Sequence, residues 1–175
     1  KKIPLNNDFS FPSQNWDISN QKVGLSIICN PNNPTANKVA IDQLEKIIAA
    51  TEHMILIDEA YIEFSSDSSA IALISKYNNL MICRTMSKAF GLAGARIGTL
   101  ISNPQIIGYL SKLKPPYNCS SLNQKAAIDQ LRKIEIVQAE VDQIIEQRSI
   151  LMKELTKLSL IKRVLPSETN FIMVE

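Results

Sequence analysis

The sequence predicts an α/β fold, in which a mainly parallel β-sheet is covered by helices. Short β-branched and apolar runs alternate in the N-terminal half with segments whose apolar residues repeat at helical spacing. Such alternation is typical of parallel strands joined by helices that pack on the sheet. A length of 175 residues suffices for one domain of ordinary size, or for one domain and part of another.

Four strands are expected in the first part of the chain. They are 23–30, 54–58, 80–84 and 96–102. Each is a short apolar run rich in β-branched residues, as in buried strands. A helix is expected over 39–51, because its isoleucines and leucine fall on one helical face. A short helix is expected over 70–76.

After Pro104 the pattern becomes mainly helical. Helices are expected over 104–113, 121–132 and 135–158, and two closing strands over 160–167 and 170–174. The longest helix carries one apolar stripe that lasts too few heptads for a coiled coil, so we expect it to pack on a neighbouring element. The proline-containing segment Lys114–Ser121 is the best candidate for a domain border.

Composition argues against several classes of function. The net charge is +2 and the charges are interspersed, which does not favour nucleic acid or a membrane surface as a partner. No apolar stretch reaches the about 18 residues that a membrane span needs. Cys29 and Cys83 lie in strand-like runs, as expected of buried free thiols in a reducing cytosol. With a single histidine, neither a zinc site nor a Ser-His-Asp triad is expected.

Polar clusters follow three of the expected strands. They read NPNNPT after the first, DEAY after the second and RTMSK after the third. Because ligands of α/β proteins gather at the carboxyl ends of parallel strands, we expect these side chains along one edge of the sheet. The candidate residues are Asn33, Asp58, Tyr61, Thr85, Ser87, Lys88 and, further along the chain, Arg96.

Each candidate also has an ordinary structural interpretation. Asn and Pro runs are usually turns, and Asp58 could cap the helix that follows it. Tyr61 could pack in the core, and Arg96 could pair with a surface acid. Lys88 lies among small and apolar residues, so it is either a surface amine in a flexible turn or an amine kept for chemistry. The coincidence of all these groups at one edge favours a binding site.

The motifs NPNNPT, DEAYIEF, RTMSKAFGLAGARIG and ETNFI occur in this order from about Ile27 to the end. Together they resemble the fold-type-I aminotransferases that use pyridoxal 5'-phosphate (PLP), and most closely the histidinol-phosphate branch of that family. The resemblance implies a cytoplasmic, homodimeric transferase of histidine biosynthesis, whose large domain is a three-layer sandwich. Its reaction would be transamination between two small molecules, histidinol phosphate and 2-oxoglutarate or glutamate, without metal, nucleic acid or membrane.

The resemblance implies catalytic roles for three residues. Lys88 would form the Schiff base with PLP and then move a proton between substrate and cofactor. Asp58 would pair with the pyridine nitrogen and keep it protonated. Tyr61, together with Asn33, would hydrogen-bond the phenolic oxygen of the cofactor.

The resemblance also implies a phosphate site. Two hydroxyls, those of Thr85 and Ser87, would donate to the phosphate, and the planar fork of Arg96 would bind it. Gly91 and Gly94 would let the backbone bend between Lys88 and Arg96. These groups would complete the cofactor contacts that the sequence contains.

The sequence departs from the family in two respects. The family usually has glycine where Ala36 stands, and alanine costs roughly 1 kcal/mol if the position needs a positive φ. The family's upstream phosphate clamp and stacking aromatic residue, and its downstream arginine for the substrate carboxylate, cannot be located. We therefore expect a piece of a longer enzyme, inactive alone and with little or no bound cofactor.

The expected organisation follows from the resemblance. Residues 1–115 would be part of the large PLP-binding domain, 116–134 a connecting helical region, and 135–175 a long helix with the start of a small C-terminal domain. Two alternative activities of the same fold stay open: an O-phosphothreonine decarboxylase and an aromatic aminotransferase. A non-enzyme alternative is the aminotransferase-like effector domain of a transcription regulator.

Overall fold

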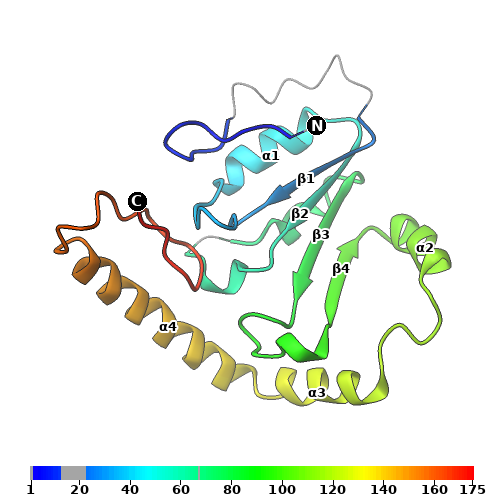
Figure 1. Ribbon diagram of the computed structural model, residues 1–175. Helices are drawn as coiled ribbons and strands as arrows, with labels where there is room; N and C mark the ends of the chain where they lie inside the picture. The colour runs from blue at the N-terminus through cyan, green and yellow to red at the C-terminus, as the bar shows by residue number, and fades with distance from the viewer. Residues whose placement is uncertain (1, 13–22, 67) are drawn as a thin grey trace.

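The computed structural model describes residues 2–12, 23–66 and 68–175 (Figure 1). Four strands form one mixed sheet in the order β1-β2-β3-β4, in which the first three strands are parallel and β4 is antiparallel to β3. The strands are β1 (Leu25–Cys29), β2 (Met54–Asp58), β3 (Leu80–Thr85) and β4 (Gly98–Ser102). Helices flank this sheet, which confirms the predicted α/β class.

The helices occupy the segments expected, with the predicted bounds over 104–113 and with ends that differ by up to three residues elsewhere. They are α1 (Ile41–Ala49), α2 (Pro104–Leu113), α3 (Ser121–Leu131) and α4 (Ile134–Leu155). Three short 3-10 turns accompany them: η2 (Ile62–Phe64), η3 (Ala70–Leu73) and η4 (Ala93–Ala95). The side chains of Asn103 and Ser120 accept backbone N–H bonds at the first turns of α2 and α3, which explains where both helices begin.

Two helical predictions were too long. The expected helix over 70–76 is the 3-10 turn η3, after which the N–H of Lys76 bonds the carbonyl of Leu73, three residues back. The expected helix end at residue 158 lies instead at Leu155. Beyond it, backbone bonds span three residues rather than four, so the last turn tightens and the helix ends.

The two expected closing strands are reduced to one antiparallel bridge between Val164 and Val174. The segment between these residues turns back on itself through side-chain hydrogen bonds. The N–H of Glu168 bonds the carbonyl of Ala36, far from the bridge. Pairing is therefore short because the intervening backbone is held by other partners.

The main core lies between α1 and one face of the sheet. Side chains of successive strand residues point to opposite faces, so Ile28, Ile57 and Ile82 lie together on the face that α1 covers. The opposite face is more open, since Leu25 is 45% exposed and Ile27 is 61% exposed. Asp58 follows Ile57 and therefore belongs to this open face.

A second, smaller core joins α4 to the segments that follow β2 and β3. Its buried members are Tyr61, Phe64, Ala89, Val137 and Val141. Figure 1 shows α4 near the end of the sheet toward which β1 and β3 point. The long helix thus packs through one stripe, as predicted, and it packs beside the polar edge of the sheet. None of the described helices is long and apolar enough to cross a membrane.

Candidate active site

The predicted polar residues lie where the three parallel strands end. Asp58 is the last residue of β2, and Thr85 is the last residue of β3. Asn33 lies in the loop after β1. The loop between β3 and β4 carries Lys88 and Arg96, and it is closed by a 3.0 Å hydrogen bond from the N–H of Met86 to the carbonyl of Ile97.

Tyr61 is the centre of the contacts among these residues. Its hydroxyl oxygen accepts a 3.1 Å hydrogen bond from the side-chain amide of Asn33. The amine nitrogen of Lys88 lies 5.2 Å from the centre of the Tyr61 ring. The ring itself is 7% exposed, so it packs in the small core while its hydroxyl lies beside Asn33. The packing interpretation of Tyr61 is confirmed, and its role in the site stays a prediction.

Lys88 is exposed and lies on a tight turn. The N–H of Gly91 bonds the carbonyl of Lys88 at 3.0 Å, and Gly91 has a φ of 66°, a value that favours glycine. The neighbouring Ala89 is buried against α4 and anchors the turn. Within the described chain Lys88 forms no ion pair. The turn and the Tyr61 ring position its amine, and no described carboxylate pairs with it.

Asp58 lies between two thiols in the sheet. The register pairs it with Cys29 of β1 and with Cys83 of β3. Partial burial and, second, the negative charge of Asp58 raise the pKa of the Cys83 thiol, which therefore stays protonated near neutral pH. Both cysteines are free, but neither is buried as expected: Cys29 is exposed and Cys83 is half-buried, because both side chains lie on the open face of the sheet.

The carboxylate of Asp58 has one local partner. It accepts a 3.1 Å hydrogen bond from the N–H of Ala60, two residues on. This bond stabilises the turn after β2. The helix-capping interpretation was wrong, because η2 begins after Tyr61 and no side chain caps it. One oxygen makes that bond, and the second oxygen accepts no hydrogen bond from a described residue.

Of the three predicted phosphate residues, Thr85 ends β3, and Ser87 and Arg96 lie in the β3–β4 loop. Within the described chain, no hydrogen bond joins two of their side chains. The hydroxyl of Thr85 accepts from the N–H of Ser87 at 3.1 Å and donates to the carbonyl of Ile97 at 3.4 Å. Arg96 is exposed, and its guanidinium donates to the carbonyl of Ala93 at 3.2 Å. No described carboxylate pairs with Arg96, so its charge is available to an anion.

Two residues in these loops that are not glycine have a backbone conformation that favours glycine. Ala36 has a φ of 60° and is fully buried, and Arg96 has a φ of 52°. The position of Ala36 therefore does have the positive φ on which the expected cost of alanine depended. Each residue costs roughly 1 kcal/mol relative to glycine, which the surrounding contacts must offset.

Sequence reasoning missed an ion pair beneath the site. Glu59 is 1% exposed, and its carboxylate accepts from two nitrogens of Arg84, at 3.0 and 3.1 Å. The hydroxyl of Ser69 and the N–H of Ala70 donate to the same carboxylate at 2.6 and 2.7 Å. The alternation of strand side chains could have shown that Glu59 faces away from Asp58, toward the core side.

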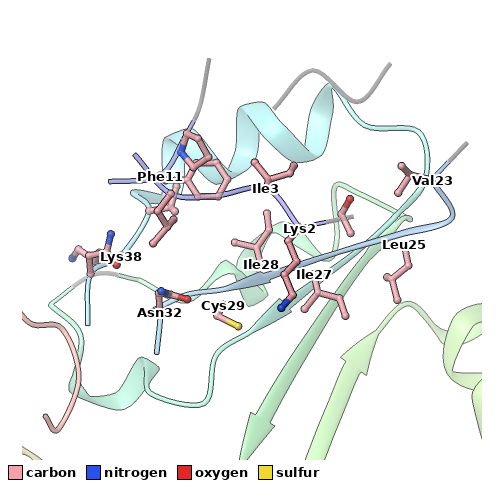
Figure 2. Close-up of a pocket in the computed structure, with 15 residues that line it drawn as sticks. Lys2, Ile3, Phe11, Val23, Leu25, Ile27, Ile28, Cys29, Asn32 and Lys38 are labelled. Carbon is pink, nitrogen blue, oxygen red and sulfur yellow. The ribbon is translucent and has the colours of Figure 1, made fainter. Parts of the chain in front are cut away.

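A pocket of about 680 Å³ lies beside this edge without containing Lys88 or Tyr61. Figure 2 shows that its lining comes from β1, from the segment 2–12 and from the loop after β1, with Cys29 and Asn32 toward the polar edge. Its walls are mainly apolar. The candidate site is therefore the group of convergent polar residues and not this pocket.

The donor set at the edge fits PLP group by group. An aldehyde requires an amine such as Lys88, and a pyridine nitrogen requires an acid such as Asp58. A phenolic oxygen requires a donor such as the hydroxyl of Tyr61. A phosphate requires a cation and hydroxyls, which one loop of this chain supplies. No cluster of His, Cys, Asp and Glu among the described residues could hold a metal ion.

Known proteins share both the sequence and the fold. Residues 5–175 match the family described as Aminotransferase class I and II. A histidinol-phosphate aminotransferase of Flavobacterium johnsoniae is 38% identical over 100% of this chain, which covers 50% of that protein. The histidinol-phosphate aminotransferase structure from Clostridium acetobutylicum is 30% identical and superposes with a TM-score of 0.90 over 97% of this chain and 53% of that one.

A third relative has the cofactor in its structure. The histidinol-phosphate aminotransferase of Sinorhizobium meliloti, solved in complex with pyridoxal-5'-phosphate, is 25% identical. It superposes with a TM-score of 0.87 over 99% of this chain and 48% of that one. This chain thus spans about half the length of the curated relatives and structures that it matches.

Proposed function

This chain belongs to the class I and II aminotransferases, and we propose that it is the central and C-terminal part of a longer enzyme that transfers an amino group between histidinol phosphate and 2-oxoglutarate or glutamate in histidine biosynthesis. One observation carries the proposal. The amine of Lys88 lies over the ring of Tyr61, whose hydroxyl is bonded by Asn33, at the edge where the parallel strands end. The relatives of this chain bear the name of that activity.

Lys88 is the residue that would hold the aldehyde end of PLP, and its amine would hold the exchanged proton. Its turn presents the amine at the sheet edge, and the described chain offers it no carboxylate partner. The neutral amine is the form that acts as nucleophile and as base. PLP, when bound, supplies a ring that accepts the electrons left when a proton leaves the substrate.

Asp58 and Tyr61 hold the two polar positions of the ring. Asp58 keeps one carboxylate oxygen for the protonated ring nitrogen, since the other accepts from Ala60. Tyr61 accepts a hydrogen bond from Asn33, so its own proton is left to donate to the phenolic oxygen. A hydroxyl that accepts a hydrogen bond is also a better donor, because the two bonds polarise each other.

The phosphate is assigned to Thr85, Ser87 and Arg96. Thr85 ends β3, and Ser87 and Arg96 lie in the loop that follows, which the Met86–Ile97 bond closes at one end of the sheet. Arg96 binds through a planar fork and carries the positive charge. Because this loop also carries Lys88, the same backbone determines the positions of the amine and of the phosphate.

The proposal extends to the organisation of the enzyme. It is a cytoplasmic homodimer, with residues 1–115 in the large domain, 116–134 as a connection and 135–175 at the start of the small domain. The choice of histidinol phosphate over O-phosphothreonine or an aromatic amino acid rests on the relatives that bear its name. A screen of amine donors, on protein that contains this chain, tests that choice.

The proposal is tested by Lys88→Ala in protein that contains this chain and binds PLP. We expect loss of the visible absorption that a lysine gives with PLP, and loss of nearly all amino transfer, because no other residue of the site carries an amine. Absorption spectra and single-turnover rates measure the two effects. Lys125→Ala is the matched control, since that lysine is exposed on α3 and pairs with Asp129. An unchanged spectrum in Lys88→Ala would remove this lysine from the mechanism.

A further inference from the structure

A turn near the C-terminus is built by its own buried hydroxyls. We call residues Ser167–Phe171 the C-terminal turn. The hydroxyl of Ser167 donates to the carbonyl of Phe171 at 2.6 Å, and that of Thr169 donates to the same carbonyl at 3.0 Å. The N–H of Phe171 bonds Thr169 at 3.3 Å, and Thr169 is fully buried. The backbone of Phe171 is therefore held in one conformation.

The C-terminal turn is tied to the two loops that carry Asn33 and Tyr61. The N–H of Glu168 bonds the carbonyl of Ala36 at 2.8 Å, three residues after Asn33. On the other side, one guanidinium nitrogen of Arg148 donates to the carbonyls of Thr169 and Phe64, at 2.6 and 3.1 Å. Arg148 belongs to α4, so this helix, the turn and the segment after Tyr61 form one unit.

The ring of Phe171 meets the ring of Tyr61. Their centres are 5.2 Å apart and their planes are 85° apart, which is the favourable edge-to-face arrangement. Lys88 contacts the same tyrosine ring, and Asn33 contacts its hydroxyl. Phe171 thus packs its ring against a tyrosine that two proposed site residues, Lys88 and Asn33, also contact.

We propose that Phe171 is a positioning residue of the site and acts through Tyr61. It holds the tyrosine ring so that the hydroxyl accepts from Asn33 and aims its proton at the phenolic oxygen of the cofactor. The inference rests on the proposed function and extends it to a residue of the ETNFI motif, to which no role was assigned. Arg148 and Glu168 support the same arrangement by holding the C-terminal turn against both loops.

The test measures the pH midpoint of the visible absorption of bound PLP. A hydrogen bond from Tyr61 stabilises the anionic phenolic oxygen and so favours proton loss from the bound chromophore, and its loss raises the midpoint. The variants are Phe171→Leu, Phe171→Tyr, Tyr61→Phe and the double variant of Tyr61→Phe with Phe171→Leu, each in protein that contains this chain and carries PLP. Circular dichroism checks that each variant is folded, and Phe171→Met replaces Phe171→Leu if the leucine variant does not fold.

We expect Tyr61→Phe and Phe171→Leu to raise the midpoint, the second by at least about 0.5 pH unit, a threefold change in the ionisation constant. Phe171→Tyr keeps the ring edge and should retain the wild-type midpoint. In the Tyr61→Phe background Phe171→Leu should cause no further shift, since it acts through the missing hydroxyl.

Three results would overturn the inference, and they differ from failure of the proposed function. A wild-type midpoint in Phe171→Leu, when Tyr61→Phe shifts it, would show that Phe171 does not position the hydroxyl. A shift in Phe171→Leu that persists in the Tyr61→Phe background would show a general loosening instead. A midpoint shift in Phe171→Tyr equal to that in Phe171→Leu would exclude the ring edge as the cause. Absence of any PLP absorption in the wild type would instead overturn the proposed function.

Discussion

At the residue scale, two adjacent acids of the DEAY motif have opposite surroundings. Asp58 ends β2 on the open face of the sheet and accepts one local hydrogen bond. Glu59 is buried and pairs with Arg84, with further donors from Ser69 and Ala70. The pleat of the strand produces this division, because successive side chains point to opposite faces. One carboxylate is left for chemistry, and the other stabilises the fold.

This division predicts opposite effects for two isosteric substitutions. Asp58→Asn should lower the rate of amino transfer by more than about tenfold, or 1.4 kcal/mol of barrier, because the ring nitrogen loses its counter-charge. Its free energy of unfolding should stay near that of the wild type. Glu59→Gln should lower the free energy of unfolding by roughly 1–3 kcal/mol, because the charge of Arg84 loses its buried partner. Steady-state kinetics and urea denaturation separate the two effects.

Each substitution is the control for the other. The two side chains differ by one methylene and adjoin in sequence, so any general effect of losing a negative charge here should appear in both. Transfer activity within tenfold of the wild type in Asp58→Asn would exclude the pairing role. Unchanged stability in Glu59→Gln would show that the ion pair with Arg84 makes no net contribution.

At the scale of elements, Glu168 fastens the C-terminal turn to the segment after Tyr61. Its carboxylate accepts from the N–H of Ser66 at 2.8 Å and from the hydroxyl of Ser65 at 3.0 Å, and the amine of Lys38 lies 3.6 Å away. Burial alone would raise the pKa of Glu168, but these donors and the lysine outweigh it, so its pKa lies below the usual range. The charged form is therefore the one that holds the elements together.

A lowered pKa makes this contribution depend on pH. A carboxyl whose pKa is lower in the folded state adds stability above its unfolded pKa, near 4.3, and loses it as the pH falls through the folded value. Glu168→Gln should thus lower the free energy of unfolding at pH 7 by roughly 1–2 kcal/mol, a modest value because the carboxylate is partly exposed. The difference should vanish in strong acid. Urea denaturation at several pH values measures it.

Glu140→Gln is the matched control for Glu168→Gln. Glu140 is exposed on α4, and its side chain takes part in no hydrogen bond or ion pair between described residues. Its substitution should leave the free energy of unfolding unchanged at pH 7. A Glu168→Gln difference that stayed constant from neutral to acid pH would contradict the assignment of the charged form.

The sequence predicted the elements better than their contacts. The strands were found because apolar β-branched runs report burial in a sheet, and their polar ends located Asp58, Thr85 and Lys88 at one edge. The contact of Phe171 with Tyr61 could not be found in this way, because 109 intervening residues separate two rings that only the folded chain brings together. The closing strands failed for a related reason, since apolar alternation does not show that side chains will hold a segment elsewhere.

At the scale of the whole molecule, the proposed cofactor contacts come from a few loops at one open edge. Lys88 and Arg96 are exposed, and the groups assigned to the phosphate lie at the end of β3 and in the β3–β4 loop. Apolar side chains on the sheet face away from α1 are also exposed, including Ile27 at 61%. Binding of a dianionic phosphate at such an edge depends on few donors and competes with water.

This arrangement predicts that the 175-residue chain alone folds but binds PLP weakly. Each missing hydrogen bond to a charged group removes roughly 1.5–3 kcal/mol. The loss of two such hydrogen bonds therefore weakens PLP binding at least about a hundredfold, since 1.4 kcal/mol is a factor of ten. The comparison is with protein of the relatives' full length. Titration of the chain with PLP, followed by visible absorption, measures this, and the Lys88→Ala chain corrects for reaction at other lysines. Tight, stoichiometric binding that Lys88→Ala abolishes would show that the residues of this chain suffice for the cofactor.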